Sequence, residues 1–191
     1  KIGTVDEMAA EYEAAEFLDG KGKLLMPGLV DGHTHTCQQL LRGRVSDEYP
    51  MIWTRFLVPF ESNLRPEDSH ISGQLACLEM IKNGTTAFAD SGGVHMEQVA
   101  EAVLESGMRA AIAKSTMDMG AAITGAMKET AREAVDRTKE LYRAYQGAGG
   151  GRIDIWFAIR QVMTCSQELI AMVRDAAAEF HTGIHAHLCE H

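Results

Sequence analysis

The chain has 191 residues, of which 46% are hydrophobic and 24% are charged, and its formal net charge is −9. This composition is typical of a globular domain with a sizeable core, while the acidic balance argues against a nucleic-acid-binding surface, which needs a basic footprint. The longest apolar runs are too short to span a bilayer, the first residues lack a secretion signal, and the four cysteines form no CxxC pair. We therefore expect a cytoplasmic protein without a membrane or nucleic-acid partner.

The first 24 residues carry little core of their own. A short strand is expected over Ile2–Val5, followed by an Ala/Glu-rich stretch and a turn at DGKG, residues 19–22. We interpret residues 1–24 as part of a small β-domain and residues 25–191 as the main domain.

From residue 25 onward, strand and helix patterns alternate. The apolar run Leu25–Val30 is typical of a strand covered on both faces. A helix is expected to begin at Pro66 and to end at Asn83-Gly84, with an apolar stripe along one side. The stripe consists of Ile71, Leu75, Leu78 and Ile81.

The same alternation continues to the end of the sequence. A β-rich run, Thr85–Asp90, precedes a pair of glycines, a helix follows to Ser106-Gly107, and Met108–Lys114 is the next apolar strand. After it, the pattern predicts an amphipathic helix, a glycine linker, a strand, a helix capped by Ser166 and a fifth strand. The helix carries Met127, Ala131, Val135, Leu141, Tyr142 and Tyr145, the linker is 147–151, and the strands are Ile153–Ile159 and Ile184–Leu188.

Five strand–helix units imply parallel strands joined by right-handed crossovers, either in an open doubly wound sheet or in a (β/α)8 barrel. The absence of a GxGxxG motif after the first strand weakens the dinucleotide-binding version of the open sheet. Polar residues at successive strand ends favour the barrel, whose sites collect side chains from several strands. These residues are His33, His35, Asp90, Asp118, Arg160, His187 and Glu190.

Two HxH pairs, His33/His35 and His185/His187, lie at predicted strand ends. In a strand, residues i and i+2 point to the same side, so each pair can present two imidazoles together. Neutral imidazoles are common metal ligands, although a single pair is equally compatible with ordinary core or surface histidines. The presence of two pairs at strand ends favours a metal site.

The segments that carry these pairs resemble the amidohydrolase superfamily, in its deaminase and triazine-hydrolase branch. PGLVDGHTHT (27–36) looks like the first barrel strand of that superfamily, and HLCE (187–190) is similar to the element at its fifth strand. NGTTAFAD (83–90) and SGMRAAI (106–112) follow the methylthioadenosine/S-adenosylhomocysteine and guanine deaminases of this branch. The resemblance implies a TIM-type (β/α)8 barrel, of which this chain covers about the first five βα units.

The resemblance also implies a role for each matching residue. His33, His35 and His187 correspond to ligands of one divalent metal ion, with zinc favoured and iron as the alternative, and Glu190 corresponds to the acid that shuttles protons. Glu190 can reach the metal only if the chain turns directly after Leu188. The fourth strand, IDIWFAIRQ, lacks the lysine of binuclear members, which implies a mononuclear site.

Substrate contacts are expected from Glu61, Arg160, Gln161 and His185. Glu61 aligns with a carboxylate that contacts ribose in methylthioadenosine deaminases, but the GPH of those enzymes is replaced here by Ile159-Arg160-Gln161. Arg160 with the downstream TCS looks more like guanine deaminases, and an arginine can donate two hydrogen bonds to a ring carbonyl. An oxopurine, a pterin or a related nucleobase is therefore the favoured small-molecule substrate, while His185 has a lining role or a structural one.

The sequence thus predicts a metal-dependent hydrolase that deaminates an aminated N-heterocycle with metal-activated water. A chlorohydrolase or cyclic amidase using the same metal site, and a non-catalytic metal-binding fragment, are the alternatives. Members of the superfamily also use a histidine on strand six and an aspartate on strand eight, so we expect the 191 residues to be part of a longer enzyme. The oligomeric state, a homo-oligomer included, stays open.

Overall fold

The computed structural model describes residues 1–45, 52–120, 123 and 125–189. Its centre is a parallel sheet in which each strand pairs with the next one in sequence. The strands are β1 (Leu29–Thr34), β2 (Thr85–Asp90), β3 (Arg109–Ala113), β4 (Ile153–Ile159) and β5 (Ile184–Ala186). An open doubly wound sheet reverses its strand order, whereas a barrel keeps the order of the sequence, as here.

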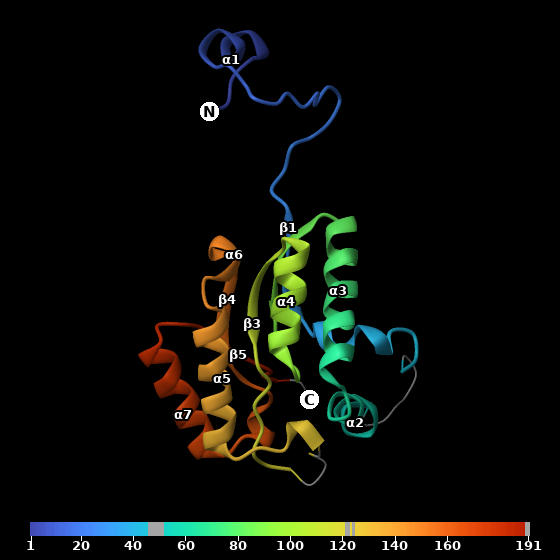
Figure 1. Ribbon diagram of the computed structural model, residues 1–191, viewed down its shortest axis with the longest axis vertical. Helices are drawn as coiled ribbons and strands as arrows, with labels where there is room; N and C mark the ends of the chain where they lie inside the picture. The colour runs from blue at the N-terminus through green and yellow to red at the C-terminus, as the bar shows by residue number, and fades with distance from the viewer. Residues whose placement is uncertain (46–51, 121–122, 124, 190–191) are drawn as a thin grey trace.

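Helices connect the strands and cover one face of the sheet (Figure 1). The long ones are α3 (Pro66–Lys82), α4 (Met96–Ser106), α5 (Ala131–Tyr145) and α7 (Gln167–Glu179). The short ones are α1 (Val5–Glu11), η1 (Thr36–Leu41), η2 (Trp53–Leu57), α2 (Val58–Glu61), η3 (Gly125–Met127), α6 (Ala148–Gly151) and η4 (Val162–Thr164). None of the described helices is long and apolar enough to cross a membrane.

The predicted helix boundaries at three positions are confirmed. Pro66 occupies the first turn of α3, where its missing N–H costs nothing. Gly107 ends α4 with φ of 77°, a left-handed conformation that glycine adopts without strain. The Ser166 hydroxyl accepts a hydrogen bond from Leu169 N and caps α7.

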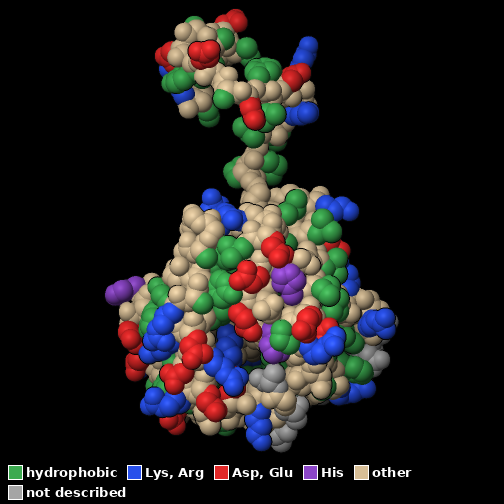
Figure 2. Space-filling model, in the orientation of Figure 1, with side chains coloured by type: hydrophobic (Ala, Val, Ile, Leu, Met, Phe, Trp, Pro, Cys, Tyr) green, Lys and Arg blue, Asp and Glu red, His purple; other side chains and the backbone are tan. Residues whose placement is uncertain are grey.

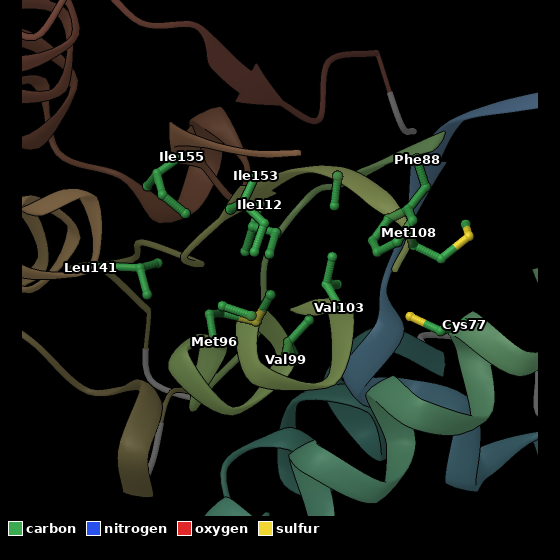
Figure 3. Close-up of a cluster of buried hydrophobic side chains, with 12 residues drawn as sticks. Cys77, Phe88, Met96, Val99, Val103, Met108, Ile112, Leu141, Ile153 and Ile155 are labelled. Carbon is green, nitrogen blue, oxygen red and sulfur yellow. The ribbon is translucent and has the colours of Figure 1, made fainter. Parts of the chain in front are cut away.

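The main core lies between the sheet and the helices (Figure 3). Ile112, Ile153 and Ile155 from β3 and β4 pack against Val99 and Val103 of α4, and all of them are fully buried. Removing these side chains from water is the principal stabilising contribution to the packing of helices on the sheet. The core therefore holds the strand ends, and any site built on them, in fixed positions.

The N-terminal segment differs from the expectation. The short strand predicted over Ile2–Val5 is wrong, because Thr4 and Glu7 form a capping box that begins α1 at Val5. Helix α1 and the chain up to β1 extend away from the rest of the protein (Figure 1). The assignment of residues 1–24 to a small β-domain stays a prediction.

The first strand and the helix after it also differ in detail. Strand β1 begins at Leu29, later than predicted, and Val30 is 72% exposed, so the prediction of a strand covered on both faces is wrong for the described residues. The predicted apolar stripe of α3 faces outward, with Ile71 and Leu78 each 55% exposed. Instead, α3 buries small residues against α4, where a Cβ on Gly73 would lie 3.2 Å from Ala102 Cβ. Close helix packing, rather than side-chain hydrophobicity, decides which face of α3 is buried.

The outer face formed by α3, α4 and α5 carries both acidic and basic side chains (Figure 2), although α4 itself carries only acidic ones. Exposed pairs such as Lys139 with Glu179, 2.9 Å apart, occur on this outer layer. Such pairs contribute little to stability.

Candidate metal centre

The ends of β1 and β5 bring three histidines together. His33 lies in β1, His35 directly follows β1, and His187 directly follows β5. The two strands are far apart in the sequence. One ring nitrogen from each of the three lies within 4.8 Å of the others. His35 Nε2 and His187 Nε2 are 3.1 Å apart, and their rings are parallel within 2°. The predicted convergence of the two HxH segments at one end of the sheet is thus present.

The chemistry of this cluster fits a metal ion. Two ligands of a tetrahedral zinc ion at about 2.0–2.1 Å are separated by roughly 3.3 Å, close to the spacing of His35 and His187. His35 Nδ1 donates to the carbonyl of Gly92 at 2.8 Å, so in the neutral ring the lone pair is on Nε2, which faces His187. This is the usual way in which a second contact fixes the tautomer of a metal-binding histidine.

His35 is held in its neutral form. Burial is the main cause that lowers its pKa from 6.5 to about 3, and the positive charge of Arg160 adds to the effect. A neutral imidazole keeps the lone pair that a metal requires.

The lowered pKa of His35 predicts a pH dependence of stability for the metal-free chain. Below pH 6.5 the unfolded state takes up a proton on this imidazole while the folded state does not, so stability falls as the pH falls. Between pH 7.5 and 5.5 the contribution of His35 should decrease by about 1.4 kcal/mol. Urea unfolding in the presence of a chelator gives the free energy of unfolding of the native chain and of His35→Asn. The free energy of the native chain should fall relative to that of the variant as the pH is lowered. A difference that is constant with pH would show that His35 titrates alike in both states.

His185 lies next to the cluster rather than within it. Its Nε2 is 3.1 Å from Nδ1 of His33, the nitrogen on the far side of the ring from Ser91. The contact orients the His33 ring, which corresponds to the lining or structural role considered for His185. A substrate contact by His185 stays a prediction.

Glu190, the expected proton carrier, lies outside the described residues. Strand β5 ends at Ala186, and Cys189 adopts φ of 55°, so the chain leaves the extended conformation at the required place. The role of Glu190 stays a prediction.

Glu61 and Arg160, which were both expected to contact substrate, form an ion pair with each other. Arg160 Nη1 and Nη2 donate to the two carboxylate oxygens of Glu61 at 3.0 and 2.9 Å, and both side chains are almost completely buried. Gln38 also donates to Glu61, and Arg160 approaches the carbonyl of Gly92 at 3.4 Å. Because Gly92 also accepts from His35, the ion pair lies directly behind the histidine cluster. Gln161, the next residue, is buried, and its substrate contact stays a prediction.

The turn after β2 contributes contacts that the sequence did not identify as functional. Ser91 Oγ lies 2.9 Å from His35 Nε2 and 3.4 Å from His33 Nε2. Gly92 has φ of 100°, and a Cβ there would lie 2.6 Å from the backbone nitrogen of Ser115. Only glycine can therefore hold its carbonyl in this position. The glycine pair after Asp90 was the one visible signal.

Comparisons with known proteins agree with this arrangement. Residues 24–191 match the amidohydrolase family. The chain is 37% identical over 190 residues to a 5-methylthioadenosine/S-adenosylhomocysteine deaminase of Pelotomaculum thermopropionicum, covering 99% of this chain and 42% of that protein. It is also 37% identical over 191 residues to a 5'-deoxyadenosine deaminase of Methanosarcina mazei, covering 98% of this chain and 43% of that protein. The chain thus spans about two fifths of the length of these relatives.

Two solved structures share the fold. A guanine deaminase from C. acetobutylicum superposes with a TM-score of 0.77 at 23% identity, over 86% of this chain and 40% of that one. An adenosine deaminase from Xanthomonas campestris with bound zinc gives a TM-score of 0.74 at 29% identity, over 85% of this chain and 36% of that one. The five parallel strands and their helices are accordingly the first part of a TIM-type barrel, as predicted.

Proposed function

Because this chain belongs to the amidohydrolase family, we propose that it carries the first part of the active site of a metal-dependent hydrolase that deaminates an aminated N-heterocycle. The observation that supports the proposal most strongly is the convergence of His33, His35 and His187 at the ends of β1 and β5. The deaminase names of the relatives at 37% identity supply the type of reaction.

One divalent metal ion, with zinc favoured and iron as the alternative, would be held by His33, His35 and His187. When bound, such an ion supplies a water nucleophile at neutral pH by lowering the pKa of that water toward about 7. The imidazoles take part as neutral ligands, which the low pKa of His35 favours. The zinc named in the related adenosine deaminase structure supports the same choice of metal.

The remaining groups orient the substrate and move protons. Glu190 is the proposed proton carrier, which gives a proton to a ring nitrogen as water adds to the amino-bearing carbon, takes up the proton that this water loses, and passes it to the amino group, which leaves as ammonia. Gln161, His185, Glu61 and Arg160 are the proposed residues around the heterocycle. Arg160 and Glu61 neutralise each other and are almost completely buried, so together they add little net charge to this side of the site.

The proposal is tested by ammonia release from a panel of substrates, using the full-length protein loaded with zinc or iron. The panel contains oxopurines and pterins, adenosine-type nucleosides, pyrimidines and triazines, and His33→Ala is the inactive control. We expect ammonia from at least one aminated heterocycle and a loss of at least 1000-fold in kcat/KM in the variant. Release of chloride or ring opening without ammonia would identify the chlorohydrolase or amidase alternative. No turnover with any metal would contradict the proposal and leave a metal-binding protein.

A further inference from the structure

We propose that Asp90 is a positioning residue, which fixes the metal-facing orientation of His35 from behind the cluster. The inference rests on the proposed metal site and extends it to a residue that does not face the metal. Asp90 is the last residue of β2 and is 1% exposed. No ion pair to a cation is found for its carboxylate among the described residues, so hydrogen bonds alone satisfy it.

One oxygen of the Asp90 carboxylate holds the backbone that directly follows His35. Asp90 Oδ2 accepts from the backbone nitrogen of Thr36 at 3.1 Å and from the Thr36 hydroxyl. Thr36 follows His35 and is itself fully buried. The backbone on the C-terminal side of His35 is therefore tied to the end of β2.

The other oxygen of the Asp90 carboxylate holds Gly92, whose carbonyl selects the tautomer of His35. Asp90 Oδ1 accepts from the backbone nitrogen of Gly92 at 2.9 Å, and the carbonyl of Gly92 accepts from His35 Nδ1 at 2.8 Å. Between them, Ser91 N donates to the carbonyl of Thr34 at 2.9 Å. Asp90 thus joins the backbone after His35 to the carbonyl that orients its ring, and the intervening turn is pinned to β1.

The chemistry explains why a carboxylate is required here. Both oxygens face donors, and a carboxylate is an acceptor at both of them. An asparagine has the same shape, but its NH₂ group would face a donor in either orientation. Burial raises the pKa of Asp90 to about 6, while the hydrogen bonds from Thr36 and Gly92 oppose that shift. The carboxylate is therefore mainly ionised at pH 7.5.

The ordinary alternative is that Asp90 only stabilises the turn after β2. The two roles differ in their effect on metal binding. A purely structural aspartate changes the free energy of unfolding but leaves the metal site of the folded protein unaltered. A positioning aspartate changes the affinity and the geometry of the metal as well, because contacts behind metal-binding histidines typically contribute about 10- to 100-fold in affinity.

The test compares Asp90→Asn with a matched control, Asp118→Asn. Asp118 makes the same kind of contact elsewhere, accepting from the backbone nitrogen and the hydroxyl of Ser166. Zinc affinity by competition with a chelator and the visible absorption spectrum of the cobalt-loaded chain are measured at pH 7.5 for the native chain and both variants. Thr36→Val, which removes the hydroxyl contact to Asp90 while keeping its size, is the second variant should Asp90→Asn fail to fold.

We expect Asp90→Asn to bind zinc about 10- to 100-fold more weakly and to alter the cobalt spectrum. Thr36→Val should change the zinc affinity and the cobalt spectrum in the same direction but by less. The zinc affinity of Asp118→Asn should remain within about 2-fold of that of the native chain. Unchanged affinity and spectrum in folded Asp90→Asn, or in Thr36→Val where Asp90→Asn does not fold, would overturn this inference while leaving the metal site intact. Failure of the native chain to bind zinc or cobalt would overturn the proposed metal site itself.

Discussion

Replacing His187 by alanine is expected to weaken zinc binding by about 100- to 1000-fold. Zinc sites with four ligands bind with roughly 10–16 kcal/mol at neutral pH, so one ligand contributes on the order of 3–4 kcal/mol, and each 1.4 kcal/mol is a factor of ten. His187 brings its ring from the opposite edge of the described sheet, because it follows β5, whereas His33 and His35 lie at the end of β1. Isothermal titration of the metal-free chain with zinc measures the change.

His70→Ala is the matched control for this titration. His70 is a histidine of α3 whose ring contacts the carbonyl of Gln98 and the carboxylate of Glu105, and it is not part of the cluster. Its replacement should leave the zinc affinity unchanged. Equal losses in the two variants would mean that zinc binds to histidines in general rather than to this site.

Replacing Arg160 by methionine is expected to reduce the free energy of unfolding by about 3–5 kcal/mol. The substitution leaves the carboxylate of Glu61 buried without its bidentate partner, and an uncompensated buried charge is strongly destabilising. Urea denaturation followed by circular dichroism measures the loss. The change should also raise the pKa of His35, because the positive charge of Arg160 is one of the causes that lower it.

The double variant Glu61→Leu/Arg160→Met separates the ion pair from the packing. Removal of both charges should recover most of the stability, since a buried ion pair often contributes little compared with apolar side chains of similar size. Lys139→Met breaks the exposed pair with Glu179 and should cost less than about 1 kcal/mol. A cost for Arg160→Met as small as that for Lys139→Met would contradict the buried pairing.

The parts of the site that lie at strand ends were predictable from the sequence. His33 lies in β1 and His187 directly follows β5, and parallel strands place their carboxyl ends at one edge, so their meeting follows from the alternation of strands and helices. The boundaries of β2 and β4 were predictable for the same reason, since each is a short β-rich run between turn residues.

The parts that depend on tertiary packing were not predictable. Glu61 and Arg160 are 99 residues apart, and no periodicity in either segment indicates that they form a pair. On α3 the apolar stripe pointed to the wrong face, because the helix approaches α4 through small residues and leaves Ile71 exposed. Asp90 was visible at a strand end, but its function depends on the donors of Thr36 and Gly92, which are brought to it only by the folded chain.

The most direct test of the metal centre is the X-ray absorption spectrum of the chain loaded with one equivalent of zinc. We predict a first shell of nitrogen and oxygen ligands at about 2.0–2.1 Å with the multiple scattering of three imidazoles, reduced to two in His187→Ala. A shell that contains sulfur at about 2.3 Å, or a spectrum that is the same in the native chain and in His187→Ala, would contradict a metal site built from His33, His35 and His187.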